Sequence, residues 1–184
     1  MTIEKIIVSG FGGQGVMGIG QLLTYAGMFD NKEVSWLPSY GPEMRGGAAN
    51  CSVIISDDPI GAPNISSADH VIVMNEPSLD KFESYVKPGG HLFINSSLIK
   101  KPASRDDIHV HYFPVNELVA EFGNPRALNM IMVGGFNEVS ETVTKESLEK
   151  AVEALYGKKK PEMLETNYKA MKFGGEKMME ASNV

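Results

Sequence analysis

A glycine-rich turn between an apolar strand and a helix constrains the fold of this chain more than any other feature. Residues 5–9 (Lys-Ile-Ile-Val-Ser) include three β-branched residues in a row, which is typical of a strand buried on both faces. Gly10, Gly12 and Gly15 follow with the spacing G-x-G-x-x-G, and residues 16–29 read as a helix. The sequence therefore predicts the strand–turn–helix unit that opens Rossmann-like sheets.

The start of this helix is a candidate anion site. Its first-turn N–H groups have no partner within the helix, and together with the helix dipole they favour a phosphate or a carboxylate. The candidate residues are Gly10, Gly12, Gly13, Gln14 and Gly15. The alternative is that the glycines only permit a tight turn and close packing of the helix, and on this motif alone both interpretations stay open.

The end of the second predicted strand argues against a nicotinamide site. A dehydrogenase carries an acidic residue about 20 residues after the glycines, where it holds the ribose hydroxyls. Here the strand at 34–37 ends in Pro38-Ser39-Tyr40, without an acid. No Lys-Ser or Lys-Thr pair follows the glycines either, so the turn is not a Walker A motif.

A second unusual segment, residues 39–47, follows that strand. It is rich in turn residues yet carries Tyr40, Glu43 and Arg45. We expect the strand before it to neighbour the first strand, so that both loops face one crevice at the carboxyl ends of the strands. Arg45 would offer a bidentate cation to a phosphate there, with Gly46 allowing close approach; the alternative is a surface loop in which Arg45 pairs with Glu43.

The rest of the chain alternates between strand and helix patterns. We expect Asn75 and Thr144 to cap helices, Pro88-Gly89-Gly90 to end a helix, and Gly174-Gly175 to interrupt the last one. Further strands are expected at 49–55, 70–74, 91–95 and 108–115, and further helices at 77–86, 116–122, from 125, from 144 and from 161.

These patterns predict one α/β domain over residues 1–184. The expected fold class is a three-layer α/β/α sandwich with a mostly parallel, Rossmann-like sheet, ending in a helical segment over about 144–184. The chain has no run of 18 apolar residues and no apolar leader, so we expect a soluble, cytoplasmic protein without a membrane span. A net charge of −6 argues against a nucleic-acid partner.

The metal-binding and nucleophilic residue types are sparse. Cys51 is the only cysteine, so the chain by itself holds neither a disulfide nor an iron–sulfur cluster, and we expect it to be a small buried residue. His109 and His111 share one face of a predicted strand but lack a third metal ligand. We predict no catalytic residue and no metal site in this chain.

The two loop motifs together identify a family resemblance. Gly10-Phe11-Gly12-Gly13-Gln14-Gly15-Val16 and the segment 37–47 (LPSYGPEMRGG) resemble the gamma subunit of the 2-oxoacid:ferredoxin oxidoreductases. The resemblance runs from about Ile3 to the last helix, and the second motif is the more specific. The Met and double Gly in Glu43-Met44-Arg45-Gly46-Gly47 look closer to the 2-oxoglutarate and branched-chain types than to the pyruvate type.

This resemblance implies one subunit of a larger enzyme. Such enzymes cleave a 2-oxoacid on thiamine diphosphate, pass electrons through [4Fe–4S] clusters to ferredoxin, and transfer the acyl group to coenzyme A. The resemblance places thiamine diphosphate, Mg²⁺ and the clusters in partner alpha and beta subunits, often with a ferredoxin-like delta subunit. For this chain it leaves a subunit interface and part of the coenzyme A site, to which Tyr40, Arg45 and Gly46 would contribute. The open alternatives are a purely structural subunit and a stand-alone, dinucleotide-binding oxidoreductase.

Overall fold

The computed structural model describes residues 1–41 and 47–182. Six strands form one sheet in the order β2-β3-β1-β4-β5-β6. The strands are β1 (Ile3–Phe11), β2 (Glu33–Tyr40), β3 (Ala48–Ser56), β4 (Ala68–Val73), β5 (Val86–Asn95) and β6 (His109–Phe113). The main helices are α1 (Val16–Phe29), α2 (Glu76–Phe82), α3 (Val115–Phe122), α4 (Leu128–Ser140), α5 (Lys145–Val152) and α6 (Leu164–Ser182).

The sheet is parallel on one side of β1 and antiparallel on the other. Strands β1, β4, β5 and β6 pair in parallel, whereas β3 runs antiparallel to both β1 and β2. The expectation that the second strand neighbours the first was therefore wrong, because β3 lies between them. The short β2–β3 connection makes a hairpin, which places consecutive strands side by side. Strand β2 still runs in the direction of β1, so both carboxyl ends lie at one edge of the sheet.

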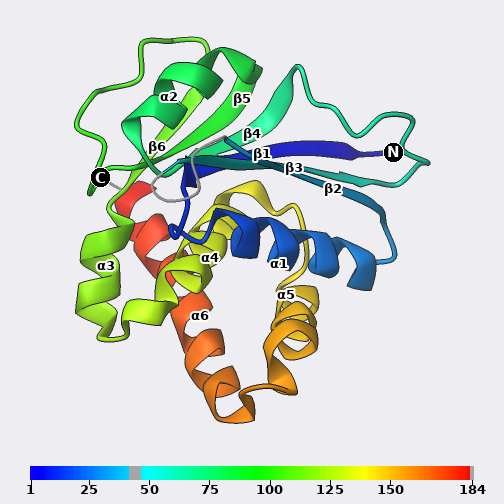
Figure 1. The fold of residues 1–184 in the computed structure, drawn as a ribbon, viewed down its shortest axis with the longest axis vertical. Coiled ribbons are helices and arrows are strands. Elements are labelled where there is room, and N and C mark those ends of the chain that lie inside the picture. The colour runs from blue at the N-terminus through cyan, green and yellow to red at the C-terminus, as the bar shows by residue number, and fades with distance from the viewer. Residues whose placement is uncertain (42–46, 183–184) are drawn as a thin grey trace.

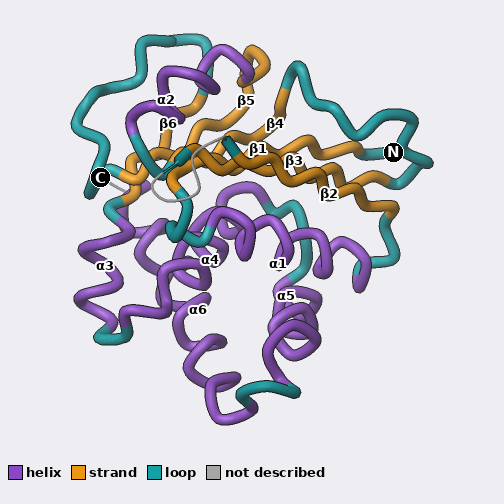
Figure 2. Tube along the Cα trace, viewed as in Figure 1, coloured by secondary structure: helices purple, strands orange, loops and turns teal. Residues whose placement is uncertain are grey.

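The predicted three layers are present but unequal. Figures 1 and 2 show α2 alone on one face of the sheet and the other five helices on the opposite face. The alternation of side chains along β1 explains the two cores, since Ile6 and Val8 pack into the cluster under the five helices and Ile7 into the cluster under α2.

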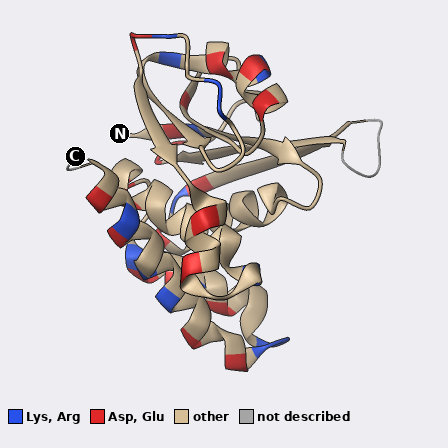
Figure 3. Ribbon diagram, turned by 90° about the vertical axis from the view of Figure 1, so that its left-hand side faces the viewer, with Lys and Arg blue, Asp and Glu red and all other residues tan. Residues whose placement is uncertain are grey.

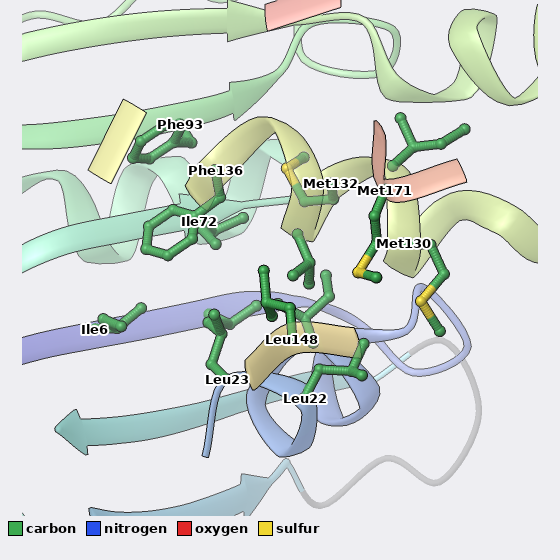
Figure 4. Close-up of a cluster of buried hydrophobic side chains, with 14 of the residues drawn as sticks. Ile6, Leu22, Leu23, Ile72, Phe93, Met130, Met132, Phe136, Leu148 and Met171 are labelled. Atoms are coloured by element: carbon green, nitrogen blue, oxygen red, sulfur yellow. The ribbon is translucent and has the colours of Figure 1, made fainter. Parts of the chain in front are cut away.

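The larger core combines branched aliphatic side chains with phenylalanines and methionines, some of which Figure 4 shows. Leu22 and Leu23 of α1, Leu148 of α5 and Met132 of α4 are each at most 3% exposed. The flexible thioethers of Met130, Met132 and Met171 fill gaps between these packed helices. The C-terminal helices thus contribute side chains to the same core as α1.

The two predicted helix breaks have different outcomes: the helical segment does end at Tyr85, before Pro88-Gly89-Gly90, whereas α6 is not interrupted at Gly174-Gly175. The segment Pro88-Gly89-Gly90 lies inside β5, where Gly89 has φ +79° and the pairing with β4 shifts register between Ala68 and His70. A bulge of this kind admits proline and glycine within a strand. Helix α6 continues through Gly174-Gly175, because these glycines lie at its crossing with α4. The predicted caps are confirmed: Asn75 accepts from Ser78 N–H at 3.0 Å and Thr144 from Ser147 N–H at 3.1 Å.

Candidate functional site

The glycine turn between β1 and α1 combines tight and open positions. Gly13 and Gly15 have φ values of +91° and +77°, a region that favours glycine. A Cβ on Gly10 would lie 2.8 Å from Met74 Cβ, so this glycine serves packing. A Cβ on Gly12 would lie 4.0 Å from its nearest neighbour, and one on Gly13 would meet nothing within 4 Å. The middle of the turn is therefore the part that a ligand can approach.

The side chain of Gln14 holds the turn in place. Its Oε1 accepts a hydrogen bond from the Phe11 N–H at 2.6 Å, and its Nε2 donates to the carbonyl oxygen of Met74 at 3.2 Å. These bonds tie the turn to the carboxyl end of β4. Both ends of the amide are engaged within the protein, so the Gln14 side chain orients the turn.

The glycine turn meets the base of the second predicted motif. The N–H of Gly12 donates to the carbonyl oxygen of Gly47 at 3.0 Å, which joins the turn to the hairpin between β2 and β3. Tyr40 ends β2 at this edge and is 71% exposed. Arg45 and Gly46 lie outside the described residues. The described ends of the two motifs thus lie at one edge of the sheet although their strands are not neighbours.

Helix α1 begins with unpaired backbone donors. Gly15 occupies its N-cap without a side-chain hydrogen bond, and its first turn has no acidic residue. The Gln14 N–H is used by the Phe11 carbonyl at 3.2 Å. Within residues 1–41 and 47–182, the N–H groups of Gly13, Gly15 and Val16 have no acceptor. Such a set of donors at a helix start is suited to an anion.

Asn129 is a neighbour of the turn that the sequence did not reveal. It belongs to the first turn of α4, and its side-chain amide lies against Gly15 and Gly18, where any Cβ would collide with it. In the sequence it is the one polar residue of the apolar run 128–133, which is too weak a signal to mark a site. Asn129 makes Gly15 a requirement of packing as well as of backbone conformation.

Cys51 is buried behind the turn. It is fully buried, its thiol donates to the carbonyl oxygen of Val16 at 3.6 Å, and burial raises its pKa to about 12. A thiol that stays protonated is neither a nucleophile nor a ligand. The prediction of a small buried residue is confirmed.

The four histidines of the chain form a stripe across one face of the sheet, which we call the histidine stripe: His70, His91, His109 and His111. Nδ1 of His91 lies 2.9 Å from Nε2 of His111. Burial, helped by the neighbouring histidines, lowers the pKa of His91 and lowers that of His111 to about 4. Among the described residues no group of three His, Cys, Asp or Glu side chains is arranged to hold a metal ion.

No helix in the described part of the chain is long and apolar enough to cross a membrane. The fold and the turn define the protein class as a Rossmann-like α/β domain whose first helix begins with backbone donors that have no side-chain cap. Residues 5–177 match the model of the pyruvate ferredoxin/flavodoxin oxidoreductase family, and the chain belongs to this family.

Curated relatives are subunits of archaeal enzymes. The 2-oxoglutarate synthase subunit KorC of Methanocaldococcus jannaschii is 34% identical over 152 residues, which cover 81% of each chain. The ketoisovalerate oxidoreductase subunit VorA of Methanothermobacter thermautotrophicus is 32% identical over 94% of this chain. This chain spans only 36% of the length of VorA.

Solved structures share the fold. The gamma subunit of a keto/oxoacid ferredoxin oxidoreductase from Geobacter sulfurreducens superposes with a TM-score of 0.81 at 30% identity, over 96% of this chain and 99% of that one. The 2-oxoglutarate:ferredoxin oxidoreductase of Magnetococcus marinus, with 2-oxoglutarate, coenzyme A and succinyl-CoA bound, gives a TM-score of 0.88 at 21% identity. The match covers 98% of this chain and 32% of that larger one, and at this identity it shows the fold alone.

Proposed function

We propose that this chain is the gamma subunit of a multi-subunit 2-oxoacid:ferredoxin oxidoreductase. The observation that carries the proposal is the similarity along almost the whole chain to a gamma subunit, with 96% and 99% of the two chains covered at 30% identity. The KorC and VorA relatives favour 2-oxoglutarate or a branched-chain 2-oxoacid as the substrate of the complex. The enzyme would act in the cytoplasm and reduce ferredoxin.

The carboxyl edge of β1 and β2 is proposed to form part of the coenzyme A site. Coenzyme A carries a pyrophosphate and a ribose phosphate, which the donors of Gly13, Gly15 and Val16 suit. The wider set proposed for this site is Gly10, Gly12, Gly13, Gln14, Gly15, Tyr40, Arg45 and Gly46. Arg45 would add a bidentate charge, and the exposed ring of Tyr40 would stack or donate a hydrogen bond.

The remaining cofactors are assigned to the partner subunits. Thiamine diphosphate with Mg²⁺ and the [4Fe–4S] clusters would supply carbon–carbon bond cleavage and electron transfer from the alpha, beta and ferredoxin-like delta chains. In this chain the turn and the start of α1 would bind and orient a phosphate. No acid, base or nucleophile in this chain takes part, so the isolated chain would be inactive.

Co-purification tests the subunit assignment. The tagged chain is expected to come out of its native extract with partners that carry a thiamine diphosphate motif and cluster cysteines. The eluate should reduce a low-potential dye only with both a 2-oxoacid and coenzyme A. A chain that elutes alone and binds a nicotinamide would instead support the stand-alone oxidoreductase.

Arg45→Ala tests the coenzyme A site in the assembled complex. Loss of a charge-assisted bond to a phosphate, worth about 1.5–3 kcal/mol, should raise the KM for coenzyme A by about 10- to 100-fold with the KM for the 2-oxoacid unchanged. Lys169→Ala removes the same charge from an exposed position on α6 and serves as the control. An unchanged KM in Arg45→Ala would favour the purely structural subunit, a reading supported by the packing role of Gly10.

A further inference from the structure

A groove lies between α4, α5 and α6, on the helical side of the molecule and apart from the glycine turn. It has a volume of about 570 Å³. Helix α4 contributes Gly134 and Glu138, helix α5 contributes Leu148 and Glu149, and helix α6 contributes residues from Tyr168 to Glu180. The coenzyme A proposal does not use this groove.

Packing on both sides keeps the groove open. At the α4–α6 crossing, a Cβ on Gly134 would overlap the backbone of Met171, so the two helices are in backbone contact. Helix α5 packs instead against α1, and the chain between α4 and α5 is fixed by Asn137, whose Nδ2 donates to the Val143 carbonyl at 2.8 Å. The groove is therefore bounded by helices that pack tightly against the rest of the domain.

The groove is lined by buried apolar side chains, and one exposed methionine lies at its rim. Leu148 and Met171 are 3% and 8% exposed, and Met179 on the rim is 48% exposed. The partly buried ring of Tyr168 lines the same groove. Apolar side chains with adaptable methionines are typical of surfaces that receive an amphipathic helix.

Acidic side chains outnumber basic ones around the groove. The rim carries Glu138, Glu149, Glu176 and Glu180 against Lys145 and Lys172, and Figure 3 shows such acidic and basic residues along the helical layer. Glu138 pairs with Lys145 at 3.1 Å and Glu180 lies 3.6 Å from Lys177. Within the described residues, Glu149 and Glu176 have no ion-pair partner. Burial, together with the carboxylates of Glu153 and Glu149, raises the pKa of Tyr168.

We propose that this groove docks an amphipathic helix of a partner subunit, with its apolar stripe on Leu148 and Met171 and its Lys or Arg residues against Glu149 and Glu176. The acidic rim selects a basic occupant by charge complementarity, and two flanking helices favour a third helix over a strand. This proposal rests on the subunit role proposed above. It adds the place at which a partner subunit binds, the groove between α4, α5 and α6, and the apolar and ionic contacts that hold it.

Photo-crosslinking in the intact complex tests the occupant. A benzophenone amino acid at Met179 is expected to crosslink to a Lys- or Arg-bearing helical peptide of another subunit, identified by mass spectrometry. The same group at Glu165, an exposed α6 position outside the groove, should not give this peptide. No crosslink, a crosslink to a second copy of this chain, or a crosslink to an acidic segment would overturn the proposal.

Charge reversal tests the rim. The double variant Glu149→Lys/Glu176→Lys should raise the dissociation constant for the partner subunits at least about tenfold, with a weaker dependence on salt. Glu165→Lys, a single charge reversal at an exposed α6 position outside the groove, where Glu165 pairs with Lys169, is the control for each of the two substitutions and should bind like the wild type. Equal binding by the double variant would overturn the docking proposal and leave the subunit role standing. A wild-type chain that joins no partner subunit would overturn both.

Discussion

At the β1–α1 turn, a methyl group added to Gly13 would meet nothing within 4 Å, whereas at the α4–α6 crossing a methyl group on Gly134 would overlap the carbonyl group of Met171. Both positions need glycine, but for different reasons. Gly13 needs it for a φ of +91°, and Gly134, in a regular helix, needs it for space. Because Gly13 is required only for its backbone conformation, the space beside it is empty, and a ligand could approach the backbone there.

The turn itself contains both kinds of glycine. Gly12 and Gly13 are open, while Gly10 and Gly15 are in contact with side chains of the same domain. The two outer glycines therefore have a packing role, although the N–H of Gly15 is also one of the donors proposed to bind the anion, and the ligand-binding proposal depends on access through the open middle of the turn. Substitutions at these positions should separate the two roles.

Gly134→Ala should have the largest effect. Alanine normally stabilises a helix interior relative to glycine, but here its Cβ overlaps backbone atoms of α6 that cannot move independently. We expect a loss of about 3 kcal/mol in the free energy of unfolding and a fall in Tm of about 6–12 °C. Urea unfolding and calorimetry measure both quantities.

Gly175→Ala is the matched control on the partner helix of the same crossing. Its Cβ would lie 2.9 Å from Oε2 of Glu138, the end of a flexible side chain that can turn away. We expect this variant to unfold with a free energy within about 0.5 kcal/mol of the wild type. If both alanine variants were equally stable, the crossing would not depend on backbone contact.

The crossing also shows what the sequence was able to predict. Helix α1 was predicted at its observed bounds, Val16–Phe29, because a glycine turn and an apolar period mark a helix locally. Gly174-Gly175 was predicted to interrupt α6 and does not, since glycine is a breaker only by propensity and a close helix neighbour overrides propensity. The need for glycine in α6 comes from its contact with α4, and this contact cannot be inferred from the sequence of α6 alone.

The order of the strands and the residues packed around the glycine turn could not be predicted either, because both depend on contacts between residues far apart in the sequence. Strand β3 between β1 and β2 follows from hairpin pairing, which a strand pattern does not specify. Asn129 reaches Gly15 from more than 100 residues away. The motifs themselves were found, because glycine spacing and turn residues act through neighbours in the chain.

Gly15→Ala should have the second-largest effect, because this position combines backbone strain with a packing contact. It combines a φ of +77° with a collision between the new Cβ and Asn129. We expect a loss of about 2–3 kcal/mol, against about 1 kcal/mol for Gly13→Ala, which carries only the left-handed strain. Equilibrium unfolding of each single variant gives these values.

A double-mutant cycle separates the two contributions at Gly15. In an Asn129→Ala background the collision is removed, and the cost of Gly15→Ala should fall to that of Gly13→Ala. If the losses in unfolding free energy of Gly15→Ala and Asn129→Ala were additive, Asn129 would not restrict Gly15. Packing would then not explain why this position needs glycine.

The smallest expected effect comes from pH and distinguishes the helical layer from the turn. The histidine stripe faces α4, with the ring of His70 5.4 Å from that of Phe136, while Glu4 and Lys87 are the other charged groups beside it. The pKa of His111 is about 4 in the folded protein, below the value of about 6.5 in an unfolded chain. Its contribution to stability is complete above about pH 7 and is lost as the pH falls toward 4.

At pH 5 we expect a loss of about 1 kcal/mol from His111, after allowance for its partial contact with solvent. Hydrogen exchange should show faster opening of β6 and α4 at pH 5 than at pH 8, once corrected for intrinsic rates, while the hydrogen-bonded amides of Gly12 and Gln14 in the β1–α1 turn stay unchanged. His111→Gln removes the titrating ring and should flatten this pH dependence. If exchange became faster by the same factor in the turn and in the helical layer, protonation of the histidine stripe would promote global unfolding. The β1–α1 turn and the α4–α6 crossing would then not differ in their response to pH.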